Sequence, residues 1–219
     1  MKNYILFIAV SLIFLTSLRV NAQNYQIGLI GGINVANLAE ENADYKSRTV
    51  FGFGGIFEFN VEKKLAICFE PMYLQKGAKE EEKGMDLTIE SKMAYLEIPM
   101  FFKVPLGTGS TIPYIMAGPT FGFRMSSKMS MESGGIVIEV DTKDLTNLVD
   151  FGFGFGGGLS FPKGNKTFFI EARYTLGLAD IVKEGEIEIG GEKETVPDAD
   201  VKTRGIQVMA GLSIPIGKK

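Results

Sequence analysis

The stretch that decides the fold class of this chain is Phe51-Gly52-Phe53-Gly54-Gly55-Ile56-Phe57-Glu58-Phe59-Asn60-Val61. Every second residue is bulky and apolar with one exception, giving a face of Phe51, Phe53, Phe57, Phe59 and Val61. Small and polar residues dominate the positions between them. Because successive side chains of a β-strand point to opposite faces, this period of two predicts a strand with two chemically different sides.

The same alternation recurs in eight segments along the chain. We predict strands at residues 25–36, 50–61, 65–76, 93–104, 111–124, 148–161, 167–178 and 204–216. The connections after the second, fourth and sixth segments are short and built from turn-forming residues, whereas the other connections are long and polar. This rhythm predicts an all-β fold, an eight-stranded antiparallel up-and-down transmembrane β-barrel with short periplasmic turns and long extracellular loops.

Three tracts inside the long connections also alternate, at residues 86–90, 135–140 and 185–189. We interpret them as hairpin arms that rise beyond the lipid. A ten-stranded barrel is the alternative interpretation.

The apolar face of the predicted strands carries almost no charge. In the segment 148–161 it holds Phe151, Phe153, Phe155, Leu159 and Phe161. Each segment exceeds the roughly 9–11 residues that a tilted strand needs to cross the hydrocarbon. Because so large an apolar face would aggregate in water, we expect it to face outer-membrane lipid. The alternative, a soluble lipocalin-like binder of small apolar ligands, requires the Phe-rich face to line an internal cavity.

The opposite face carries glycines and isolated charged residues, which suit a narrow interior. Eight strands enclose a space that side chains can fill, and charges placed there need partners. We therefore predict a lumen plugged by side chains and held by an internal ion-pair network. The predicted members of this network are Glu58, Glu70, Glu97, Lys103, Arg124, Asp150, Glu171 and Arg173.

The N-terminal residues resemble a secretory signal. Lys2 precedes an apolar run at residues 5–18, and the small-residue pattern Val20-Asn21-Ala22 follows it. We expect residues 1–22 to be a cleaved signal peptide and residues 23–219 to form one outer-membrane β-barrel domain. The expected location is the cell outer membrane.

The composition argues against most enzymatic and nucleic-acid functions. The chain has no His, one Cys and a net charge of −3, with no basic block that would bind nucleic acid. Gly152, Gly154 and Gly157 match a dinucleotide-binding pattern, but no βαβ unit follows them. The carboxylates could serve a hydrolase as acid and base, but without an accompanying His the ion-pair interpretation is favoured. We therefore expect no enzymatic activity, no cofactor and no metal site.

Four segments resemble a known family. They are residues 25–38 (YQIGLIGGINVANL), 95–99 (YLEIP), 113–119 (PYIMAGP) and 171–178 (EARYTLGL). In these segments the chain is similar to the PorT-like outer-membrane β-barrel proteins. The resemblance implies an eight-stranded outer-membrane barrel, in a family whose namesake takes part in protein secretion.

These observations lead to one functional hypothesis and its alternatives. We expect a non-enzymatic barrel with a structural or partner-interaction role. The polar loops at residues 79–92, 125–147 and 179–203 could bind calcium, surface glycans or a partner, such as an envelope or secretion-system protein. An accessory role in a secretion or transport system is the alternative.

Overall fold

The computed structural model describes residues 25–41, 45–62, 64–82, 87–189 and 192–216. The predicted signal peptide therefore lies outside the described residues. Within them, no helix is long and apolar enough to cross a membrane.

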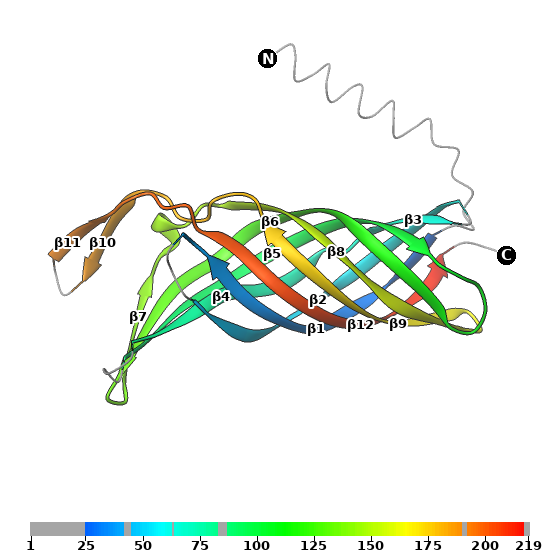
Figure 1. Cartoon of the computed structure of the whole chain (residues 1–219), viewed down its shortest axis with the longest axis horizontal. Coiled ribbons are helices and arrows are strands. Elements are labelled where there is room, and N and C mark those ends of the chain that lie inside the picture. Colours follow the sequence, from blue (N-terminus) through cyan, green and yellow to red (C-terminus); the bar gives the residue numbers. More distant parts are fainter. Residues whose placement is uncertain (1–24, 42–44, 63, 83–86, 190–191, 217–219) are drawn as a thin grey trace, which may run out of the picture.

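Most of the described chain forms one closed antiparallel sheet (Figure 1). The strands of the ring are β1 (Tyr25–Ala39), β2 (Lys46–Glu62), β3 (Leu65–Phe69), β4 (Met72–Glu82), β5 (Leu87–Pro105), β6 (Ile112–Ser133), β8 (Val149–Lys163), β9 (Lys166–Gly177) and β12 (Lys202–Ile216). β1 pairs with both β2 and β12, and pairing of β5 with β6 completes the ring. Since β3 and β4 both pair with β2 and β5, they share one position. The ring thus has the eight predicted positions.

The break between β3 and β4 interrupts the segment predicted as one strand, 65–76. It occurs at Glu70 and Pro71, and proline has no backbone N–H for the ladder. The neighbouring strands remain attached because Gly55 N donates to Pro71 O at 3.0 Å and Glu70 N donates to Pro99 O at 3.2 Å. The chain therefore keeps its direction through the break.

The connections alternate as predicted, but the strands on the loop side extend further than their predicted ends. β5 begins at Leu87 and β6 continues to Ser133, so much of the loops predicted at 79–92 and 125–147 is paired sheet. β7 (Ile136–Asp141) pairs with the end of β6, while β10 (Gly185–Ile189) and β11 (Glu192–Val196) form a separate hairpin. Figure 1 shows β7, β10 and β11 at the opposite end of the barrel from β3. The tract 135–140 overlaps β7 and the tract 185–189 forms β10, both outside the ring, whereas residues 87–90 continue the ring strand β5 and residue 86 lies outside the described residues. The ring keeps eight positions, so the ten-strand alternative is wrong.

The apolar face points outward, as predicted. On β8, Phe151, Phe153 and Phe155 are 39%, 42% and 50% exposed. Asp150, which directly precedes Phe151 and points to the opposite face, is 3% exposed. The same alternation holds on β12, where Ile206 and Val208 are exposed and Gln207 is buried. The lipocalin-like alternative is wrong, because the Phe-rich face does not line a cavity.

The interior contains apolar clusters as well as polar groups. One cluster joins Ile30, Ile56, Met72, Leu74, Phe169 and Met209. Another lies at the loop end and joins Leu38, Ala78, Met93, Tyr95, Ile181 and Val201. Glycines on the inner face make room for these groups: a Cβ on Gly154 would lie 2.8 Å from the Phe101 ring. At this position a ring from one strand packs directly against the backbone of a glycine on another.

Candidate functional site

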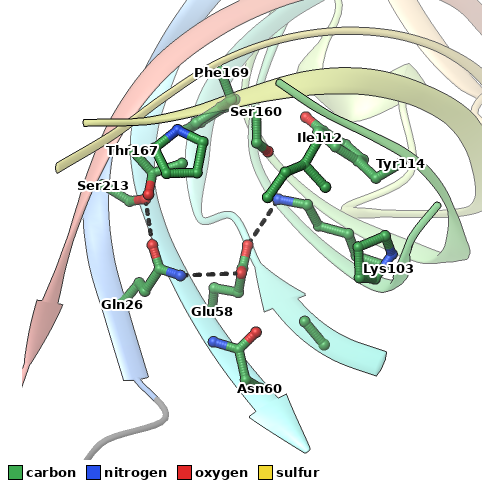
Figure 2. A pocket seen from close by; sticks show the side chains of 13 residues that line it. Gln26, Glu58, Asn60, Lys103, Ile112, Tyr114, Ser160, Thr167, Phe169 and Ser213 are labelled. Atoms are coloured by element: carbon green, nitrogen blue, oxygen red, sulfur yellow. Dashed lines mark hydrogen bonds and ion pairs between the residues drawn. The ribbon is translucent and has the colours of Figure 1, made fainter. Parts of the chain in front are cut away.

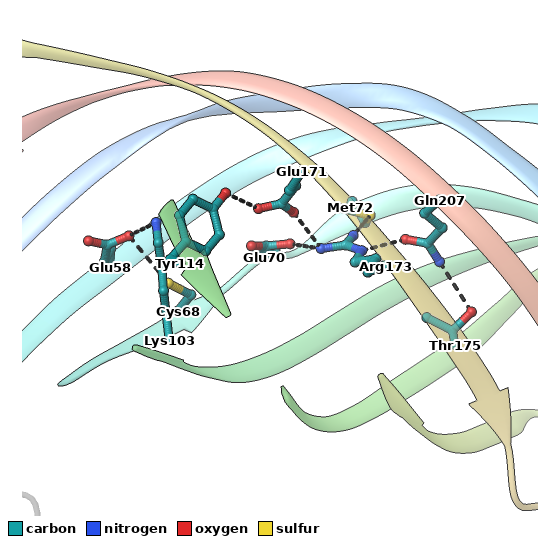
Figure 3. A network of polar contacts seen from close by, with 10 residues as sticks. All are labelled: Glu58, Cys68, Glu70, Met72, Lys103, Tyr114, Glu171, Arg173, Thr175 and Gln207. Atoms are coloured by element: carbon teal, nitrogen blue, oxygen red, sulfur yellow. Dashed lines mark hydrogen bonds and ion pairs between the residues drawn. The ribbon is translucent and has the colours of Figure 1, made fainter. Parts of the chain in front are cut away.

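The centre of the interior is Arg173 on β9, which is 2% exposed. Its Nη1 pairs with Glu70 Oε2, and the same nitrogen lies 3.1 Å from Glu171 Oε1. Its Nε donates to Gln207 Oε1 at 2.6 Å (Figure 3). The guanidinium carbon also lies 5.1 Å from the centroid of the Phe101 ring. One guanidinium therefore serves two buried carboxylates and fixes an amide on the neighbouring strand.

A second polar group lies nearer the turn end. Lys103 Nζ is 2.8 Å from Glu58 Oε2, and the Cys68 thiol donates to the same oxygen at 3.4 Å. Lys103 Nζ also lies 4.1 Å from the centre of the Tyr114 ring. The Tyr114 hydroxyl donates to Glu171 Oε2 at 2.8 Å, which connects this group to the one around Arg173. Figure 3 shows the continuous chain of contacts.

A third group lies toward the loop end. Lys76 Nζ is 2.8 Å from Glu97 Oε2 and 2.9 Å from Asp150 Oδ2. The Thr203 hydroxyl donates to the same Asp150 oxygen at 2.7 Å. Lys76 also lies 5.0 Å from the centre of the Tyr95 ring, so its charge contacts carboxylates and an aromatic face.

Of the eight residues predicted for one network, five lie in a single chain of contacts: Glu58, Lys103, Glu171, Arg173 and Glu70. Glu97 and Asp150 pair with Lys76 in the loop-end group, and Arg124 belongs to neither set. Arg124 donates to the carbonyl of Lys143 in the loop region and makes no ion pair with the interior carboxylates among the described residues. Next to it, a register shift between Ala94 and Tyr95 on β5 places Ala94 opposite Ser126 and Tyr95 opposite Arg124. Arg124 therefore lies beside a bulge, where its side chain turns to the loops.

Lys76 was missing from the prediction, although the sequence carried a signal for it. Lys76 has the same parity as Glu70 and Cys68, which alternation places on the inner face. With Lys76 included, five buried carboxylates face three buried cations among the residues that the structure describes. These are Glu58, Glu70, Glu97, Asp150 and Glu171 against Lys76, Lys103 and Arg173. The described interior therefore contains more acidic than basic side chains, and a cation can pair with more than one carboxylate.

A small polar pocket opens at the turn end of the barrel (Figure 2). Its volume is about 170 Å³, and the Lys103–Glu58 pair lines it. On its other side Ser213 donates to Gln26 Oε1 at 2.8 Å, and Gln26 Nε2 donates to Glu58 Oε1 at 3.4 Å. These polar walls suit a few water molecules.

The extended sheet on the loop side carries its own ion pairs. Glu90 Oε1 lies 2.5 Å from Lys79 Nζ, and its other oxygen is 3.7 Å from both Arg48 and Lys92. Partial burial alone raises the pKa of the Glu90 carboxyl, but the hydrogen bond from Lys79 and the nearby charges hold this pKa below its usual range. The carboxylate is thus ionised at neutral pH and ties three strands together.

The described residues include no group of three or more His, Cys, Asp or Glu side chains that could hold a metal ion. The carboxylates instead have Lys and Arg partners. Their arrangement can hold strands together and fill the interior.

Comparison with known proteins places this fold among outer-membrane barrels. A family model described as an outer membrane protein beta-barrel domain matches residues 21–183. The structure is similar to Neisserial surface protein A, with a TM-score of 0.50 and 14% identity over 88% of this chain and 97% of that one. No curated protein matches the chain in sequence.

Two further structures are similar at lower scores. OprG from Pseudomonas aeruginosa has a TM-score of 0.49 and 10% identity, over 88% of this chain and 95% of that one. Ail from Yersinia pestis has a TM-score of 0.45 and 14% identity, over 87% of this chain and 99% of that one. At these identities the likeness concerns the fold.

Proposed function

The chain belongs to the outer membrane protein β-barrel domain family, and we propose that it acts as a non-enzymatic barrel with a plugged lumen and partner-binding loops. Its location is the outer membrane, and its outward apolar face meets lipid. Within the proposal, the strands provide a rigid support, and the long loops meet a partner outside the cell.

The proposal of a plugged lumen is supported by large side chains that are buried at several positions along the interior. Phe101 and Tyr95 are fully buried, and Glu97 and Arg173 are 1% and 2% exposed. Eight-stranded barrels enclose a space that side chains can fill, so these residues leave little room for a continuous water column.

Conductance in planar lipid bilayers tests the plugged lumen. We expect the purified barrel to give no lasting single-channel steps. Two adjacent residues of β5 provide matched variants, because Phe101 is fully buried inside and Phe102 is 46% exposed outside. Phe101→Ala should raise ion leakage, whereas Phe102→Ala should not. Regular, long-lived steps from the unmodified protein would contradict the proposal.

The partner-binding role is supported by the outer end of the sheet. β7 pairs only with β6 among the described strands, which leaves its other backbone edge open. Ile136, Val137 and Ile138 on this strand are 69%, 56% and 55% exposed. An open edge with exposed apolar side chains is suited to pairing with an extended segment of another protein.

Photo-crosslinking on intact cells tests the partner role. A photoreactive amino acid at Val137 should give a discrete protein adduct. The same group at Lys64, an exposed residue at the opposite end, serves as the control. If Val137 yields no adduct above the Lys64 background, the partner role of β7 fails.

A secretion-accessory role is the second candidate, supported by the PorT-like segments, and deletion of the gene would then trap other proteins in the periplasm.

A further inference from the structure

A second cavity, of about 190 Å³, lies at the loop end of the barrel. Its walls are mainly apolar, with Met93 and Met129 from the strands and Leu145, Ile181 and Val182 from the connecting segments. The polar network lies deeper in the lumen, below Tyr95 and the loop-end cluster. The cavity is therefore an apolar chamber near the extracellular surface, separate from the ion-paired interior.

The volume of this cavity limits the size of the ligand that it can hold. An apolar cavity of about 150 Å³ holds one benzene molecule, so this cavity accommodates a six-membered ring with one or two further heavy atoms. Ligand pockets of proteins typically combine such apolar walls with a few converging polar groups.

Among the polar residues that line the cavity, Ser127, Thr142 and Thr146 bring their hydroxyls together and are 3%, 9% and 6% exposed. Tyr45, Ser91 and Lys128 also line it. Ser127 Oγ lies 2.9 Å from Thr142 Oγ1 and 2.8 Å from Thr146 Oγ1. Thr146 Oγ1 also donates to the carbonyl of Thr142 at 2.8 Å. The three hydroxyls thus form one hydrogen-bonded relay.

The direction of this relay follows from proton counting, because each hydroxyl has one proton to donate. Thr146 gives its proton to the Thr142 carbonyl, so Ser127 must donate to Thr146. Thr142 must then donate to Ser127. All three protons are used, and the oxygen that retains the most accepting capacity is Thr142 Oγ1. A ligand that engages the relay therefore has to be a hydrogen-bond donor.

We propose that this cavity binds small amphipathic molecules with an apolar body about the size of benzene and a single O–H donor, as in phenols. The apolar body contacts the Met, Leu, Ile and Val side chains. The donor group binds the lone pairs of Thr142 Oγ1.

Binding of 4-fluorophenol and of 4-fluorotoluene, which has nearly the same shape but no donor, tests the proposal. The measurement is ¹⁹F NMR titration of the full barrel in lipid nanodiscs, with empty nanodiscs to measure partitioning into lipid. We expect saturable binding of both probes, with the phenol about fivefold tighter, the effect of one net hydrogen bond.

Two variants separate the two parts of the site. Val182→Trp fills the cavity and should abolish saturable binding of both probes. Thr142→Val keeps the shape but removes the accepting oxygen, and should remove the preference for the phenol while binding of the toluene persists. Thr88→Val, on β5 outside the cavity lining, is the matched control and should change neither. Native folding of each variant is checked by heat-modifiable migration on gels.

A measurement on the unmodified protein makes the test independent of the variants. Methyl groups of labelled Met93 and Met129 should show nuclear Overhauser effects to bound 4-fluorophenol. Absence of these effects, or uptake equal to that of empty nanodiscs, would overturn the proposed site. A preference for the phenol that survives in a folded Thr142→Val variant would overturn the role of the relay.

Discussion

Replacing Arg173 with methionine will destabilise the barrel by about 3–5 kcal/mol, the usual cost of removing one partner of a buried ion pair while the other stays charged. Arg173 is the shared partner of Glu70 and Glu171, and its removal leaves, in the part of the chain that the structure describes, five buried carboxylates with two buried cations. The Nε contact to Gln207 is also lost, so a buried amide loses a partner. The free energy of unfolding, measured by reversible urea titration in lipid vesicles, checks the effect.

A compensated variant separates charge from packing. Adding Glu70→Gln and Glu171→Gln to Arg173→Met removes the two unpaired carboxylates, and it should recover most of the lost free energy of unfolding. A loss below about 1 kcal/mol for the single variant would contradict the described contacts, since it is far below the usual cost of an unpaired buried charge. A triple variant no more stable than the single one would show that packing, not charge, dominates.

Replacing Phe155 with lysine will cost about 2–4 kcal/mol of folding free energy in lipid, the penalty for a cation at the bilayer midplane. Phe155 lies near the middle of β8 and is 50% exposed on the outer face. The same substitution at Phe161, near the turn end of β8, should cost only about 0–1 kcal/mol because it lies near the interface. The measurement is the same urea titration in vesicles.

The pair of lysine variants is informative because a barrel that faced water would respond differently. On a water-exposed face, lysine would be neutral at both positions or would improve solubility. Equal costs at Phe155 and Phe161 would therefore contradict the depth assignment. Phe155→Leu, which keeps an apolar side chain, serves as the control and should cost less than about 1 kcal/mol.

The sequence was sufficient to predict which face of each strand meets lipid, because side-chain direction depends on parity alone. Phe153 and Asp150 follow opposite parities on β8, and the structure places them outside and inside. The alternation of turns and loops likewise predicted the order of strands in the ring. Local pattern was enough for both, since neighbouring strands along the chain pair with each other.

The contacts within the interior were harder to predict, because they depend on distances across the lumen. Glu70 and Arg173 are separated by 103 positions, and neither β3 nor β4, which flank Glu70, pairs with β9, which carries Arg173. Parity put both inside, but only the tilt and stagger of the closed ring determine that they meet. Arg124 has inward parity as well, but its guanidinium reaches the Lys143 carbonyl in a connection whose path parity does not specify.

The most direct test of the sidedness of this barrel is the contact of its phenylalanine rings with lipid. In nanodiscs containing protonated lipid, labelled Phe151, Phe153 and Phe155 should show nuclear Overhauser effects to acyl-chain protons. Phe101 and Phe169, which are buried in the interior, should show none. Acyl-chain effects at Phe101 and Phe169, with none at the three residues of β8, would contradict an apolar outer face and a filled interior.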